Sequence, residues 1–110
     1  MTAELPASLD GVRLLHLACG AGELSLDLAR RGAEVIGVDP SRADVLAARA
    51  RASALAVPAR FVISDIADLR HMLPEPESFA IVVTDERTAE ANADIVEWFL
   101  EPGGRLVVAG

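Results

Sequence analysis

The chain reads LLHLACGAG from Leu14 to Gly22, a short apolar run that leads directly into a glycine-rich turn. A run of this kind, bounded by glycine, is typical of a buried strand. The residues that follow, 23–31, place leucines near one face of a helical repeat, and Gly32 is a typical helix stop. Strand, glycine turn and helix in this order open a βαβ unit.

The same alternation continues along the chain. Strands are predicted at residues 13–17, 34–38, 60–63, 79–84 and 105–109. Helices are predicted at 23–31, from Ser41 to before Pro58, at 66–72 and at 88–100, with Pro102-Gly103-Gly104 after the last. Parallel strands with right-handed crossovers then give an α/β fold, a three-layer doubly wound sheet with five parallel strands in the order 3-2-1-4-5 and helices on both faces.

A sheet of this order changes direction between its first and fourth strands, and ligands bind beyond the carboxyl ends of the strands at that point. Gly20 and Gly22 lie there, where glycine lets the backbone approach a ligand closely and the next helix presents free N–H groups. A turn with two such glycines occurs in NAD, flavin and S-adenosylmethionine sites alike. A tight turn without a ligand is the alternative interpretation.

Asp39 follows the second predicted strand, in the segment Val38-Asp39-Pro40-Ser41. A carboxylate at this strand end can accept hydrogen bonds from both hydroxyls of a ribose. The alternative is that Asp39 only caps the following helix, although Ser41, with Asp44 three residues later, already supplies that signal. We favour ribose binding.

Composition excludes several classes of function. The net charge is −7, all ten basic residues are arginine, and an acidic surface repels a phosphate backbone, so we expect no nucleic-acid partner. The one cysteine, Cys19, leaves no internal disulfide and no cysteine-rich metal site, and no metal ligand set is assigned. Without a membrane-length apolar run or a signal-peptide pattern, the chain is expected to be cytoplasmic and not membrane-bound.

Four motifs in collinear order make the chain similar to the class I S-adenosylmethionine-dependent methyltransferases. That family carries V-L-D-L-G-C-G-T-G, V-x-G-V-D-x-S, G-D-A-x-x-L followed by L-P-F-x-x-x-S-F-D-V-V, and L-K-P-G-G-R-L-V. This chain has LLHLACGAG at 14–22, VIGVDPS at 35–41, SDIADL at 64–69, LPEPESFAIVV at 73–83 and LEPGGRLV at 100–107. NAD binding fits less well, because Ser25 occupies the third glycine position of a dinucleotide turn and the later matches stay unexplained.

The resemblance implies S-adenosylmethionine as the cofactor and gives roles to individual residues. Gly20 and Gly22 would shape the loop beneath its methionine part, and Asp39 would bind the ribose. Pro40 would lie against the adenine, whose amino group would donate to Asp65 while the Ile66 N–H reaches a ring nitrogen. Thr84 would lie near the sulfonium and the substrate.

The chain departs from the family at two positions of the first motif and at its end. His16 stands where the family has an acidic residue, and is either a structural histidine or a ligand contact. Ala18 stands where the family has its first glycine, which is tolerable if the backbone there has ordinary dihedrals. The family continues after the fifth strand through a further helix and an antiparallel hairpin.

The expected function is S-adenosylmethionine-dependent methyl transfer to a small-molecule or protein acceptor. It is carried out by a single domain, residues 1–110, either alone or completed by a partner chain. The alternative is a non-catalytic S-adenosylmethionine-binding module or a degenerate structural relative. No catalytic residue is assigned; Asp85 and Glu86 are either near a substrate or simply acidic residues at a helix start. The apolar strand at 105–109 lies at the sheet edge and predicts a homodimer or a partner chain there, unless residues 1–10 cover it.

Overall fold

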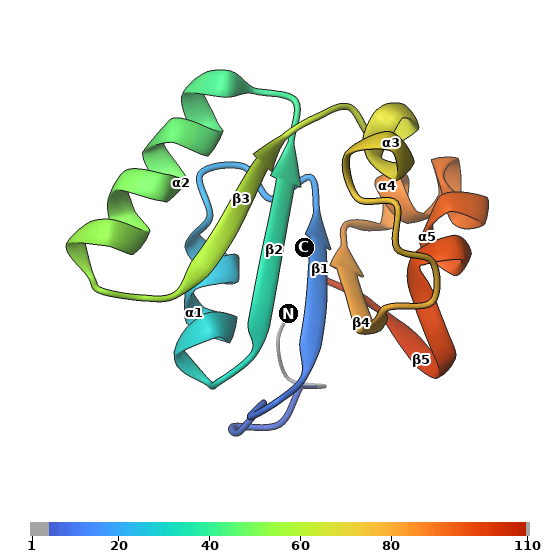
Figure 1. Ribbon diagram of the computed structural model, residues 1–110, viewed down its shortest axis with the longest axis horizontal. Coiled ribbons are helices and arrows are strands. Elements are labelled where there is room, and N and C mark those ends of the chain that lie inside the picture. The colour runs from blue at the N-terminus through green and yellow to red at the C-terminus, as the bar shows by residue number, and fades with distance from the viewer. Residues whose placement is uncertain (1–4, 110) are drawn as a thin grey trace.

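The computed structural model describes residues 5–109, and within them five parallel strands form one sheet (Figure 1). The strands are β1 (Arg13–Leu17), β2 (Glu34–Asp39), β3 (Ala59–Ile63), β4 (Phe79–Thr84) and β5 (Leu100–Val108). Their order is β3-β2-β1-β4-β5, which confirms the predicted fold. The chain therefore changes direction between β1 and β4, as a doubly wound sheet requires.

Helices cover both faces of the sheet (Figure 1). One face carries α1 (Glu23–Arg30) and α2 (Arg42–Ala54), and the other carries η1 (Ile66–Asp68), α3 (Leu69–Met72), α4 (Glu86–Ala91) and α5 (Ala93–Phe99). Ser41 caps α2 as predicted, because its side chain accepts a hydrogen bond from the Asp44 N–H at 3.2 Å.

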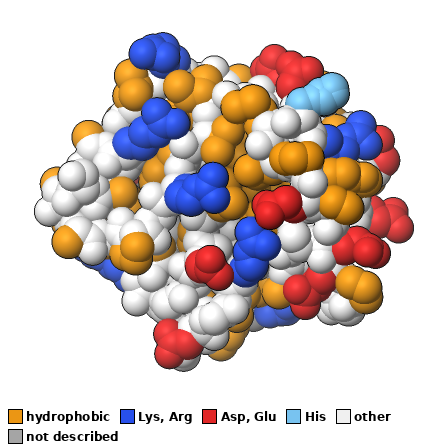
Figure 2. Space-filling view, in the orientation of Figure 1, with side chains coloured by type: hydrophobic (Ala, Val, Ile, Leu, Met, Phe, Trp, Pro, Cys, Tyr) orange, Lys and Arg blue, Asp and Glu red, His pale blue; other side chains and the backbone are white. Residues whose placement is uncertain are grey.

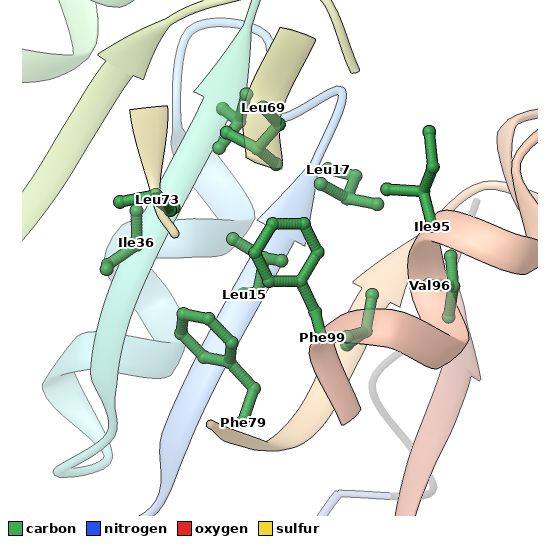
Figure 3. Packing of buried hydrophobic residues seen from close by; sticks show 11 residues of the cluster. Leu15, Leu17, Ile36, Leu69, Leu73, Phe79, Ile95, Val96 and Phe99 are labelled. Atoms are coloured by element: carbon green, nitrogen blue, oxygen red, sulfur yellow. The ribbon is translucent and has the colours of Figure 1, made fainter. Parts of the chain in front are cut away.

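The core beneath α5 is built from fully buried side chains of β1, β4 and the helix itself (Figure 3). The rings of Phe79 and Phe99 meet edge-on with their centroids 6.0 Å apart, and Leu15 and Leu17 lie beside them. Burying each of these side chains stabilises the fold by about 1.5–3 kcal/mol. Trp98, half-buried, packs edge-on against Phe99.

The segment before β1 packs on the opposite face. Leu5 and Leu9 are buried in one cluster with Leu14 and Val107, and the Leu9 N–H donates to the Arg31 carbonyl at 2.7 Å. Cover of the β5 edge by residues 1–10 is the alternative to a dimer, and residues 1–4 of that segment lie outside the described residues. In the described part, Leu5 and Leu9 pack in the cluster on the α1 side of the sheet.

The prediction of one helix at 88–100 is wrong in two respects. The helical segment starts earlier than predicted, and it consists of two helices. It starts at Glu86 because the Asp85 carboxylate caps α4, accepting from the Thr88 N–H at 2.8 Å and the Thr88 hydroxyl at 2.7 Å. It breaks at Asn92, whose φ is −131° and whose side-chain amide donates to the Thr88 carbonyl at 2.9 Å. Asparagine often interrupts a helix by such local hydrogen bonds.

The start predicted for β5 is also wrong, because the strand begins at Leu100 and includes the proline-glycine segment. Pairing jumps from Phe79–Leu100 to Ile81–Arg105, which is a bulge. Gly104 is required there, since a Cβ would lie 2.9 Å from the Glu101 carbonyl oxygen. The prediction treated this segment as a loop because glycine and proline are rare inside strands.

Candidate functional site

The candidate site lies where the carboxyl ends of β1, β2 and β4 meet, at the upper edge of the sheet in Figure 1. β1 is the central strand, and the turn at residues 18–22 leads from it into α1. The crossover from β1 leads to β2 on one side, while β4 pairs with β1 on the other. This is the point where doubly wound sheets hold their ligands.

The turn after β1 has an unusual backbone. Ala18, Gly20 and Gly22 have φ angles of 56°, 57° and 86°, all in the left-handed region. A Cβ on Gly20 would meet nothing within 4 Å, so this side of the turn is open to a ligand, whereas one on Gly22 would lie 2.8 Å from the Ala48 Cβ. The condition under which alanine is tolerable at position 18, ordinary backbone dihedrals, is therefore not met, and alanine there costs about 1–2 kcal/mol.

Asp39 links this turn to the end of β2. Its Oδ2 accepts a hydrogen bond from the Gly20 N–H and its Oδ1 accepts one from the Ser41 N–H, both at 2.9 Å. Because Ser41 caps α2, the side chain of Asp39 is not needed as the cap. Each carboxylate oxygen can accept a further hydrogen bond, and the group is half-buried at the rim of the sheet.

His16 is buried at the switch point, with 7% of its surface exposed. Its Nδ1 lies 2.6 Å from the hydroxyl of Ser25, which is fully buried in the first turn of α1. Burial lowers the pKa of His16 to about 4, against the opposing effect of the Asp39 and Asp85 carboxylates. The ring is therefore neutral at neutral pH, and it has a structural hydrogen bond.

Thr84 lies at the end of β4, as predicted, and its side chain is buried. Its hydroxyl donates to the Leu17 carbonyl at 2.9 Å, its own carbonyl accepts from the Ala109 N–H at 2.9 Å, and only 1% of its surface is exposed. The polar groups of Thr84 thus tie β4 to β1 and to the end of β5. Asp85, the next residue, caps α4, and the Thr88 hydrogen bonds lower the pKa of its carboxyl.

The remaining candidates lie along the same rim. Pro40 and Asp65 are exposed, and Ile66 is half-buried at the start of η1. The Ser64 N–H donates to the Asp39 carbonyl at 3.2 Å, so the ends of β3 and β2 are adjacent. The structure therefore brings together the residues after β1, β2 and β3, while Thr84 faces the interior.

Sequence reasoning missed Ser25 as the partner of His16. The sequence contains a weak signal, a serine in the first turn of a helix that otherwise buries leucine and alanine. Spacing alone could not join it to a histidine nine residues earlier on a strand.

Two hollows of the described surface lie along β3. One is lined by residues of β1, β2 and β3, and the other extends from β3 to Arg49 of α2; both include Arg60. Figure 2 shows apolar and basic side chains side by side on the face of the molecule that it views. Within residues 5–109, no helix is long and apolar enough to cross a membrane. In the same range, no three His, Cys, Asp or Glu side chains are grouped so that they could hold a metal ion.

A doubly wound sheet with an open glycine turn and an oriented carboxylate at the next strand end defines a nucleoside-binding class of domain. Residues 14–104 match the family described as methyltransferase domain, and the chain belongs to that family. The resemblance noted from the four motifs is thereby confirmed.

Two curated relatives are named ubiquinone biosynthesis O-methyltransferase. The protein from Rhizobium etli (strain CIAT 652) is 37% identical over 94% of this chain and 43% of its own length. The protein from Bradyrhizobium diazoefficiens is 38% identical over 92% of this chain and 40% of its own length. The chain thus spans less than half the length of these relatives.

Solved structures show the same fold. A SAM-dependent methyltransferase from Thiobacillus denitrificans, in complex with S-adenosyl-L-homocysteine, aligns with a TM-score of 0.75 and 27% identity over 90% of this chain and 42% of its own. A 16S rRNA methyltransferase from T. thermophilus, in complex with AdoMet and guanosine, aligns with a TM-score of 0.81 and 32% identity over 96% of this chain and 30% of its own.

Proposed function

We propose that residues 1–110 form a single domain that binds S-adenosylmethionine and belongs to a methyltransferase acting on an oxygen of a small molecule. The observation that carries this proposal is the Asp39 carboxylate, which two backbone N–H groups orient beside the open Gly20 turn. Family membership and the ligands of the solved relatives support it.

The rim residues fit the parts of this cofactor. Asp39 would accept hydrogen bonds from the ribose hydroxyls, and Pro40 would pack on the adenine. Asp65 and the Ile66 N–H would contact the adenine edge, because the end of β3 lies beside that of β2. The turn from Ala18 through Gly20 to Gly22 would lie beneath the methionine part of the cofactor, and His16 would lie below the turn. Thr84 would hold the strand ends together near the sulfonium.

The bound cofactor would supply an activated methyl group on a sulfonium. Methyl transfer from a sulfonium depends chiefly on in-line proximity and orientation, so the chain's own contribution is to bind and orient. Asp39 and Asp85 place negative charge beside the switch point, which favours a cationic ligand there. No general base is assigned.

The acceptor is inferred from charge and from the curated relatives. Their names contain O-methyltransferase, which supports an oxygen acceptor in a small molecule. One solved relative is an rRNA methyltransferase, but a net charge of −7 disfavours an RNA acceptor here. A protein acceptor is the remaining alternative. A second candidate function is a non-catalytic module that binds S-adenosylmethionine, which the departures from the family motif at His16 and Ala18 favour.

We also propose a cytoplasmic homodimer, or a complex with a partner chain, through the edge of β5. Leu106 and Val108 are 37% and 42% exposed beside this edge. The opposite edge is protected, because the Arg49 guanidinium donates to the Phe61 carbonyl of β3 at 2.7 and 3.2 Å. Pairing at β5 would complete the site if substrate-facing residues come from the partner.

Calorimetric titration with S-adenosylmethionine and S-adenosylhomocysteine tests the proposal directly. Saturable binding of both is expected, and methyl transfer to phenolic acceptors is then assayed by mass spectrometry. Binding without transfer would support the non-catalytic module, and absence of binding at millimolar ligand would overturn both candidate functions.

A further inference from the structure

Three charged side chains lie on one face of the sheet, near the amino ends of β1, β2 and β3. Arg13 of β1 pairs with Glu34 of β2, and Ile36 of β2 pairs with Arg60 of β3. Residues paired in this way point to the same face of a sheet, and so do alternate residues of one strand. All three charged residues therefore lie on the face of Ile36, which packs in the cluster beneath α5.

An exposed charge on the face of a parallel sheet is unusual, because helices normally cover both faces. Phe61, the next residue of β3, follows this rule, since it is buried against α2 on the other face. On the face of Arg60, however, α3 is a single turn of four residues, and Arg60 is exposed. The sheet is therefore open at Arg60.

The open area forms a hollow of about 310 Å³. Its lining includes Arg13, Glu34, Ile36, Pro58 and Arg60, so apolar and charged side chains meet in it. This volume lies at the lower end of the range for small-molecule sites, about 300–1,000 Å³. The size and the lining of the hollow suit a short apolar chain with one charged end.

The charge of the hollow is opposite in sign to that of the whole chain. Two arginines and one glutamate line it, whereas the chain carries ten arginines against seventeen acidic residues. The Arg13 guanidinium is already engaged, since it donates to the Ser78 carbonyl at 3.2 Å and lies 3.9 Å from the Glu75 carboxylate. Within residues 5–109, Arg60 has neither a hydrogen bond from its side chain nor an ion pair. Arg60 is therefore the positive charge that is available to a ligand.

We propose that this hollow binds a small aliphatic monocarboxylate, at the end of the strands opposite to the proposed cofactor site. The ligand's carboxylate would accept two hydrogen bonds from the planar guanidinium of Arg60. Its alkyl chain would lie against Ile36 and Pro58. Glu34 places a carboxylate of the protein in the same hollow, so a ligand with a second negative charge is disfavoured.

Three ligands with the same alkyl chain, hexanoate, hexanamide and hexylammonium, test the proposal. The readout is the δ1 methyl signal of Ile36 in NMR titrations, and the δ1 methyl signal of Ile81, which is buried on the opposite face, is the internal control. The chains are the parent, Arg60→Gln, Glu34→Gln and Arg30→Gln. Arg30 is an exposed arginine of α1, so its replacement makes the same change of charge on the other face of the sheet.

Hexanoate is expected to shift the Ile36 signal saturably and to bind the parent about fivefold more tightly than hexanamide, because only the carboxylate pairs with Arg60. Hexylammonium is expected to cause no saturable shift. Arg60→Gln is expected to remove the preference for hexanoate, Glu34→Gln to tighten hexanoate binding about twofold, and Arg30→Gln to leave it unchanged. An unshifted Ile81 signal in all four chains reports that the fold is intact.

Three results would overturn the inference. The first is a parent whose Ile36 signal does not shift saturably with hexanoate, and the second is a parent that binds hexanoate and hexanamide equally. The third is an equal loss of hexanoate affinity in Arg60→Gln and Arg30→Gln, which would reveal a general effect of net charge. Repeating the titration with saturating S-adenosylhomocysteine checks that the two sites are separate: an unchanged hexanoate affinity is expected, and displacement of hexanoate would contradict the assignment.

Discussion

The backbone N–H of Gly20 donates to Oδ2 of Asp39 at 2.9 Å, across nineteen residues of sequence. The other carboxylate oxygen accepts from the Ser41 N–H, so the group is oriented from both sides before any ligand arrives. An acceptor fixed in advance loses little conformational entropy when it binds. The shape of the glycine turn and the direction of the carboxylate are therefore set together.

Replacing Asp39 with alanine is expected to weaken S-adenosylmethionine binding more than any other single change at the rim. Each lost hydrogen bond to the charged group costs about 1.5–3 kcal/mol. Asp44→Ala is the matched control, because it removes the same charge from the adjacent helix without touching the carboxylate that Gly20 holds. Calorimetry compares the two, and equal affinities would show that the ribose assignment is wrong.

Replacing Ala18 with glycine is expected to stabilise the fold. Ala18 has a φ of 56°, and relief of its strain, about 1–2 kcal/mol, exceeds the entropic cost of glycine, about 0.5–1 kcal/mol. Ala21→Gly in the same turn is the control, since Ala21 is not among the residues with positive φ and should lose stability. Urea unfolding measures the stability of both variants, and a loss of stability in Ala18→Gly would show that the backbone at Ala18 is not strained.

The pKa of His16 predicts a stability change in acid. The ordinary value of 6.5 falls to about 4 in the folded chain because the ring is buried. Between these values the unfolded chain binds a proton that the folded chain does not, so stability is complete above pH 6.5 and falls toward pH 4, by up to about 1.4 kcal/mol per pH unit. His16→Asn cannot titrate and should show a shallower decline in urea unfolding across this range. Parallel pH profiles for the two proteins would mean that the ring is not held neutral.

The sheet could be predicted from sequence because each strand is a short apolar run with glycine, proline or a charged residue beside it. Asp39 could be placed at the site for the same reason, since it follows such a run directly. The break at Asn92 could not be predicted, because Asn92 and Thr88 fit an uninterrupted helical pattern. Only the hydrogen bond from the Asn92 side chain to the Thr88 carbonyl reveals the end of α4. The interior direction of the Thr84 hydroxyl depends on the Leu17 carbonyl of a distant strand, which no local pattern contains.

The edge of β5 yields the last prediction, which concerns assembly. Val107 is buried in the cluster on the α1 side, whereas Leu106, the neighbouring residue of the strand, is 37% exposed. If two copies pair along β5, Leu106→Lys places a charge beside the joined strands and should shift the protein from dimer to monomer. Leu46→Lys is the matched control, because Leu46 is 43% exposed on α2, away from that edge. Sedimentation at micromolar concentration decides the question, and a parent that sediments as a monomer, with the same mass in both variants, would rule out the homodimer.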